Sequence, residues 1–242
     1  MVVGIVAGLF GIGYEALAKP VVSRQGLIET EFDGGFSPKA LPKNTPLPIS
    51  FHILGKIRSL DPEEPHPPAL REFQLEGDKH VTVNTGGLPT CAEGKLQATT
   101  TEAARKACGP AIIGTGKTVV GVLFPDQNEF DVHSELTAFN GGVRGGVTTL
   151  YVHAFLTAPI TAAIVTKVKI KKIHKGRYGT LSVASIPKIA GNGAVKSFSL
   201  TIEKGVLFAT CPDGHLNARG TAVLADGTRI AAGVTRPCTP KG

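Results

Sequence analysis

The sequence predicts an all-β protein. Apolar and polar residues alternate with period two in many short runs rich in β-branched residues, and Gly, Pro, Asp and Asn separate these runs. The 242 residues include 30 glycines and 17 prolines, as expected of many strands joined by tight turns. With 11 phenylalanines, 3 tyrosines and no tryptophan, the core must be built mainly from aliphatic side chains and Phe.

Strands are predicted along the chain from residue 27 onward. They cover 27–32, 48–54, 70–75, 80–83, 118–124, 135–139, 148–156, 163–170, 180–186, 195–202, 205–210, 221–224 and 228–234. One short helix is predicted near 99–108, in TTTEAARKAC, because Thr99 to Thr101 can cap its first turn and alanines favour its interior.

The second half of the chain repeats motifs of the first half in the same order. TEFDGG is matched by TAFNGG, FHIL by VHAF, ALREFQL by AVKSFSL, and TCAEGKLQA by TCPDGHLNA. We therefore predict two related β-sandwich repeats in tandem, residues 19–128 and 129–242, each of about 100 residues. The alternative is one larger pseudo-symmetric β-sandwich in which strands of both copies share sheets.

Residues 1–18 predict a signal peptide. An apolar run from Val2 to Gly13 is too short for a transmembrane helix, and Ala16-Leu17-Ala18 forms an A-x-A cleavage pattern before Lys19. The basic n-region is missing, which would fit a start codon further upstream. An uncleaved anchor and a buried apolar strand are the other interpretations. No transmembrane span is expected in the mature chain.

The four cysteines predict two disulfides, since an even number of cysteines in an exported chain favours a disulfide framework. Nearest-neighbour pairing joins Cys91 to Cys108 and Cys211 to Cys238. The first disulfide would contribute on the order of 3 kcal/mol by restricting the unfolded chain. Zinc binding is the alternative, but no C-x-x-C motif or histidine cluster accompanies these cysteines.

The chain is basic, with a formal net charge of +7, and its strongest local charge signal is KVKIKKIHKGR, residues 167–177. Strand alternation would place Lys167, Lys169 and Lys171 on one face and apolar residues on the other. Surplus lysines can simply keep a surface soluble. The first interpretation of this lysine row is that it protects an edge strand from unwanted pairing.

The same segment supplies the candidate site for a partner. A lysine row facing solvent suits an anionic cell-wall polymer, and an edge strand suits another copy of the chain. Nucleic acid is not expected, because only Tyr178 lies near enough to stack a base. The residues of this candidate anionic-partner face are Lys167, Lys169, Lys171, Lys175 and Arg177.

The segment GPAIIGTGKTVV, residues 109–120, contains a motif one residue short of a phosphate-binding loop. A working loop lies between a buried parallel strand and a helix whose N-terminus binds the phosphates. Here the predicted helix precedes the motif and a predicted strand follows it. Nucleotide binding is therefore not expected. The segment is interpreted as the exit from a disulfide-tethered insertion into a strand, with Lys117 on the surface at the strand end.

No catalytic residue, cofactor or metal site is predicted. The chain lacks a G-x-S-x-G elbow, and its cysteines are expected to be oxidised. The repeat-matched His52 and His153 favour a packing or hydrogen-bonding role in both copies. Asp131 and His133 lie close together, as do four potential ligands in the proline-rich LDPEEPHPP, which we interpret as a solvated turn. These four are Asp61, Glu63, Glu64 and His66.

The segments GGFSPKALP, 34–42, and CPDGHLNARG, 211–220, resemble those of a group of uncharacterised exported all-β proteins of high-GC Gram-positive bacteria. This resemblance implies export and a tandem β-sandwich-like fold, and it supplies no activity or site residue. The sequence thus predicts an exported, non-catalytic structural or binding protein of the cell envelope or extracellular space. The alternatives are an adhesin or ligand-binding module for an anionic polymer or glycan, and an exported hydrolase whose site the motifs do not reveal.

Overall fold

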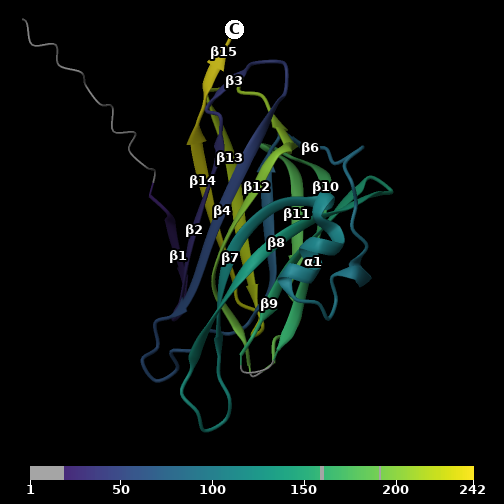
Figure 1. Cartoon of the computed structure of the whole chain (residues 1–242). Helices are drawn as coiled ribbons and strands as arrows, with labels where there is room; N and C mark the ends of the chain where they lie inside the picture. The colour runs from purple at the N-terminus through teal and green to yellow at the C-terminus, as the bar shows by residue number, and fades with distance from the viewer. Residues whose placement is uncertain (1–18, 159–160, 191) are drawn as a thin grey trace, which may run out of the picture.

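The computed structural model describes residues 19–158, 161–190 and 192–242 and confirms the all-β class (Figure 1). The expected signal peptide, 1–18, lies outside the described residues. The helical elements are α1 (Thr101–Cys108) and the 3-10 turns η1 (Glu93–Lys95) and η2 (Gly109–Ala111). The strands are β1 (Val21–Gln25), β2 (Ile28–Ser37), β3 (Ala40–Pro42), β4 (Leu47–Ser59), β5 (Leu70–Asp78), β6 (Val81–Val83), β7 (Ile112–Val122), β8 (Phe130–Arg144), β9 (Val147–Leu156), β10 (Ala162–Lys175), β11 (Tyr178–Ser185), β12 (Ala194–Ala209), β13 (His215–Leu224), β14 (Arg229–Pro237) and β15 (Thr239–Lys241).

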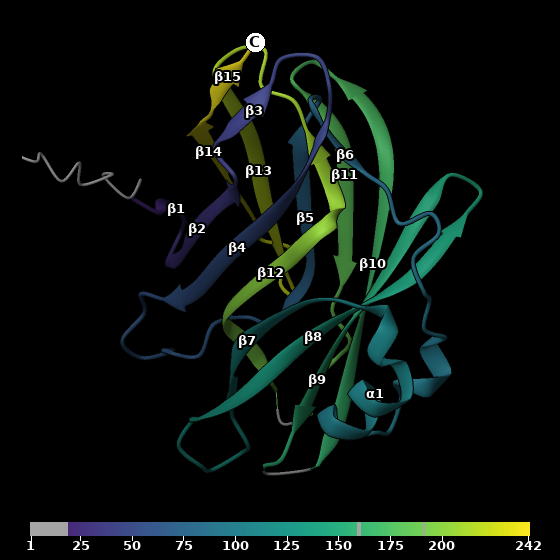
Figure 2. The same ribbon diagram turned by 45° about the horizontal axis from the view of Figure 1, so that its top comes forward.

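Of the strands in the described residues, thirteen form one antiparallel sheet that curls into a nearly closed barrel (Figure 2). The order is β1-β2-β4-β12-β7-β8-β9-β10-β11-β5-β13-β14, and β6 pairs with β12. The end strands β1 and β14 lie side by side, with no strand pairing between them in the described part of the chain. Arg236 of β14 bridges this seam, since its Nε donates to the carbonyl oxygen of Gly34 on β2 at 2.8 Å. The remaining strands, β3 and β15, form a small parallel pair at the end where the C-terminus lies (Figure 1).

Alternation along each strand separates an inner face from an outer face. On β10, Val168 and Ile170 face the barrel interior, whereas Lys169 and Lys171 are exposed. The predicted alternation is therefore correct. The interpretation of the lysine row as edge protection is wrong for Lys167 and Lys169, because these residues pair with β9 on one side and with β11 on the other. Lys171 lies beyond the pairing with β9 and pairs with β11 alone.

The tandem-repeat interpretation is not confirmed. Strands from the two halves of the chain are interleaved in one sheet, with β12 between β4 and β7 and with β5 between β11 and β13. One rotation does not relate the matched motifs either, since β2 and β8 are four places apart in the sheet order whereas β5 and β12 are six places apart. Residues 19–128 and 129–242 thus contribute strands to the same barrel.

Residues 84–111, which we call the outer cover, lie outside the barrel against β8 and β9 (Figure 2). The predicted helix forms at α1, where the hydroxyl of Thr100 caps the first turn by accepting from the Ala103 backbone N at 3.1 Å. The predicted disulfide Cys91–Cys108 closes the outer cover. It packs with α1 against Phe139 of β8, so this part of the sheet is buried on its outer face.

The barrel interior is filled unevenly. At one end, the predicted disulfide Cys211–Cys238 packs in a cluster with side chains of β2, β3, β4 and β13. Inside the barrel, Phe73 of β5 contacts Phe32 of β2 and Phe198 of β12, with ring centroids 6.1 and 5.1 Å apart. On β11 the inward side chains are smaller and leave a space.

Both disulfides join the cysteines paired from the sequence, which is consistent with an oxidising, exported environment. None of the helices within the described residues has the length and apolarity that crossing a membrane would require.

Candidate functional site

The inner face of the barrel lines a partly open cavity of about 240 Å³. Side chains from β2 and from β4 through β14 line it, and most of them are Val, Leu, Ile and Phe. For scale, an engineered apolar protein cavity of about 150 Å³ binds benzene. The interior of this barrel therefore has room for a small organic molecule.

The cavity exists because inward side chains on one part of the sheet are too small to meet the opposite side. Thr180, Ser182 and Ala184 of β11 line the cavity and are only half-buried, although β11 is paired with a strand on each side. Gly77 of β5 and Ala218 of β13 continue this stretch on the next strands. We call these five residues the small-residue wall. Their accessible surface faces the space inside the barrel.

Charged groups beside the cavity have partners within the protein. Arg236 forms an ion pair with Asp33. Asp78 accepts hydrogen bonds from the backbone N and the side-chain amide of Asn217, both at 2.9 Å, and lies 3.0 Å from Nδ1 of His80. Among the described residues, no charged side chain that lines the cavity lacks a partner.

The candidate anionic-partner face lies on the outside of the barrel, away from the cavity. Lys167 Nζ lies 2.6 Å from Glu93 of the outer cover, and this hydrogen bond raises the pKa of Lys167. Lys175 Nζ lies 3.2 Å from Glu76 of β5. Within the described chain, the members of this face that are exposed and form no ion pair are Lys169, Lys171 and Arg177.

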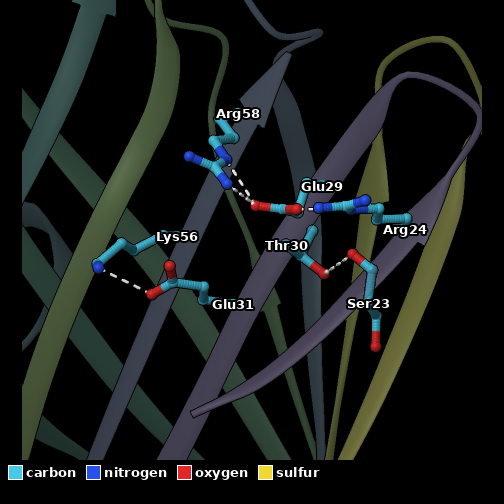
Figure 3. Close-up of polar contacts among 7 residues, drawn as sticks. All are labelled: Ser23, Arg24, Glu29, Thr30, Glu31, Lys56 and Arg58. Atoms are coloured by element: carbon cyan, nitrogen blue, oxygen red, sulfur yellow. Dashed lines mark hydrogen bonds and ion pairs between the residues drawn. The ribbon is translucent and has the colours of Figure 1, made fainter. Parts of the chain in front are cut away.

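A second charged cluster joins β1, β2 and β4 (Figure 3). Glu29 is only 2% exposed because Arg24 and Arg58 on the neighbouring strands cover its carboxylate, each donating from Nε at 2.6 Å. The hydrogen bond from Arg24, with that from Arg58, holds the pKa of Glu29 below its usual value against the opposing effect of burial. Lys56 and Glu31 pair beside it at 2.8 Å. Since these charges satisfy one another, the cluster ties strands together near the seam.

The near-phosphate-loop motif lies inside β7 rather than in a loop. A Cβ on Gly114 or Gly116 would lie 2.3 or 2.0 Å from a backbone oxygen of β12, so these glycines permit a close approach of two strands. Lys117 is exposed in the middle of β7. Its predicted place at a strand end is wrong, because the strand already begins at Ile112.

The candidate metal ligands are engaged with other residues. Asp131 lies 2.9 Å from Lys196 Nζ. His66 Nδ1 lies 3.1 Å from Oε1 of Glu129, away from the acidic residues of its own loop. Within the part of the chain that the structure describes, no three His, Cys, Asp or Glu side chains are placed to share a metal ion.

The repeat-matched histidines occupy different environments. His153 on β9 is fully buried under the outer cover, and its Nε2 lies 3.0 Å from the carbonyl oxygen of Thr99. Burial lowers the pKa of His153, so the neutral ring donates from Nε2 and leaves Nδ1 without a partner among the described residues. His52 on β4 is exposed, and its ring lies over Gly35 of β2, where a Cβ would approach its Cε1 to 2.5 Å. Both histidines therefore lie against neighbouring backbone, but only His153 is buried.

Sequence reasoning missed the cavity. The small-residue wall is spread over β5, β11 and β13, which are far apart in the sequence and become neighbours only through strand pairing. Alternation identifies which residues face inward, but the residues across the barrel decide whether a small side chain leaves a void. Inward Gly, Ala, Ser and Thr on several strands are the signal that could have indicated it.

Comparison of this chain with protein-family models, with curated proteins and with solved structures finds no match.

Proposed function

We propose that this chain is an exported, non-catalytic binding protein that holds a small apolar ligand inside its barrel. The apolar cavity of about 240 Å³ carries this proposal. Ligand sites are concave, mostly apolar and largely preformed. Protein interiors that serve stability alone pack to nearly crystalline density, because each void removes dispersion contacts. A cavity of this size is therefore better explained by a ligand than by packing.

Export is part of the proposal. The two disulfides support it, because disulfides persist in oxidising compartments. The apolar N-terminal run that ends in Ala16-Leu17-Ala18 supports it as well. Both features favour a protein of the cell envelope or the extracellular space.

Filling the cavity tests the binding function. In Ala184→Leu, the larger side chain projects from β11 into the cavity. Toluene is a suitable probe, since a smaller apolar cavity already binds benzene. We expect wild-type protein to bind toluene in calorimetric titration and Ala184→Leu to bind it at least tenfold more weakly, with a free energy of unfolding within about 1 kcal/mol of wild type.

The matched control is Val183→Leu, because Val183 neighbours Ala184 on β11 and does not line the cavity. Its toluene affinity should equal that of wild type. Wild-type protein that takes up no toluene, or equal binding by both leucine variants, would show that the cavity is not a ligand site.

A second candidate function is attachment to an anionic polymer, favoured by the exposed and unpaired Lys169 and Lys171. Exposed charges attract an anionic polymer over about 30 Å at 0.01 M salt, and this range falls to about 3 Å at 1 M salt. The double variant Lys169→Glu/Lys171→Glu should recover several-fold less poly(glycerol phosphate) than wild type in a low-salt pull-down. The control is Lys117→Glu, which changes an exposed lysine on β7. Equal recovery by the two variants would remove the basic face from consideration.

A further inference from the structure

Hydroxyl groups on β10 and β11 face the apolar cavity without a partner from the protein. Thr166, Thr180 and Ser182 line the cavity, and none of their hydroxyls makes a hydrogen bond within the described residues. Their oxygens are open to the cavity, since none is among the sealed, unpaired polar atoms of the described chain. Thr118, which also lines the cavity, differs because its hydroxyl donates to the Ser197 carbonyl oxygen at 2.9 Å.

Unpaired hydroxyls are unfavourable in such surroundings. A Thr or Ser hydroxyl can donate one hydrogen bond and accept others. An occupant that displaces water from the cavity without offering a partner leaves the hydroxyl unpaired, which costs free energy, whereas Val or Ala of similar shape would carry no such penalty. Three unpaired hydroxyls on a mostly apolar lining therefore indicate a polar group on whatever occupies the cavity.

Two of these hydroxyls, those of Thr180 and Ser182, belong to the small-residue wall. Thr180 and Ser182 are two residues apart on the same face of β11. Thr180 lies against Gly77 of β5, where a Cβ would approach its Oγ1 to 2.7 Å. Because Gly77 has no side chain, the Thr180 hydroxyl remains uncovered on that side.

The charge state of the ligand follows from the neighbouring groups. Arg236 and Asp78 are the charged residues of the lining, and Asp33 and His80 already pair with them. A carboxylate in the cavity would lose its hydration without gaining an unpaired cation, because Arg236 is paired with Asp33. An ammonium would find no accessible carboxylate, because Asp78 is only 3% exposed and already accepts hydrogen bonds from Asn217. An alcohol or carbonyl group needs only a neutral hydrogen-bonding partner.

We propose that the cavity binds an uncharged molecule of about ten non-hydrogen atoms, scaled from the benzene-sized cavity, whose hydroxyl or carbonyl group bonds to Thr180 and Ser182. This assignment rests on the proposed function and narrows its ligand to a neutral, singly polar compound.

Three probes of one carbon skeleton test the assignment: toluene, benzyl alcohol and benzoate. The test variant is Thr180→Val/Ser182→Ala, and the conservative control Thr180→Ser keeps both hydroxyls. We expect the double variant to bind benzyl alcohol roughly tenfold more weakly than wild type, as loss of neutral hydrogen bonds implies, and to bind toluene at least as well. Thr180→Ser should retain most of the affinity for benzyl alcohol, and benzoate should not bind to any of the proteins.

The outcomes separate the two proposals. If wild type does not bind toluene, the binding function fails and the ligand class fails with it. If toluene binds but the double variant changes the affinities for toluene and benzyl alcohol by the same factor, the ligand class is wrong while the binding function stands. Benzoate binding more tightly than benzyl alcohol would also overturn the assignment. Should the double variant not fold, the single variant Ser182→Ala is compared with Thr180→Ser in the same titrations.

Discussion

The two sides of the barrel interior follow the same inward and outward alternation but are packed differently. On one side, Phe32, Phe73 and Phe198 contact one another across strands that are not sequence neighbours. Around β11, inward positions hold small or hydroxyl-bearing residues such as Thr180 and Ser182, and Ala184 of this strand pairs directly with Phe73 of β5, where the two parts of the interior meet. The strands are paired on both sides, so side-chain size decides where the interior is filled.

If the proposed binding function holds, one sheet divides stability and binding between its parts. The packed side and the disulfide-linked end supply the buried apolar contacts that stabilise the barrel. The small-residue wall gives up such contacts, because an empty space has no atoms to attract. The cavity can persist only because the rest of the interior is well packed.

Matched Leu→Ala substitutions should separate the two sides most strongly. Leu224 is 2% exposed in a packed cluster, whereas Leu200 lines the cavity and is half-buried. We expect Leu224→Ala to lower the free energy of unfolding by about 3–4 kcal/mol and Leu200→Ala by about 1–2 kcal/mol, because truncation at a cavity removes fewer contacts. Urea titrations measure both values. Equal losses would mean that the cavity is closed in solution.

Local sequence patterns were sufficient for the features that depend on neighbouring residues. Spacing predicts the alternation on β10, with Lys169 and Lys171 on one face and Val168 and Ile170 on the other. Spacing and composition also predict the cap of α1 at Thr100 and the all-β class. The disulfides also followed from nearest-neighbour pairing, since each closes a short loop.

The features that depend on strand order could not be predicted from the sequence. Matched motifs such as those in β5 and β12 record similar turn and strand chemistry, which does not specify the neighbours of a strand. The basic strand was placed on an edge for the same reason, although β9 and β11 flank it. The candidate site was missed because Gly77 and Thr180 meet only through the pairing of β5 with β11.

The smallest effect is expected outside the barrel, where the outer cover packs against the sheet. Because burial lowers the pKa of His153 below 6.5, the folded protein keeps its ring neutral while the unfolded chain takes up a proton near that pH. The contribution of His153 to the free energy of unfolding should be complete above that pH and should decline as the pH falls below it, until the folded ring is protonated too.

His153→Gln is the control, because glutamine keeps a neutral N–H donor for the Thr99 carbonyl oxygen and does not titrate. The difference in the free energy of unfolding between wild type and this variant should shrink as the pH falls from about 7.5 to about 5. A difference that stays constant would contradict a buried neutral ring. Toluene binding should not follow this change, because the outer cover contacts the outer face of β9 and the cavity lies on the inner face. A parallel loss of toluene affinity would instead show that the cover and the cavity open as one cooperative unit.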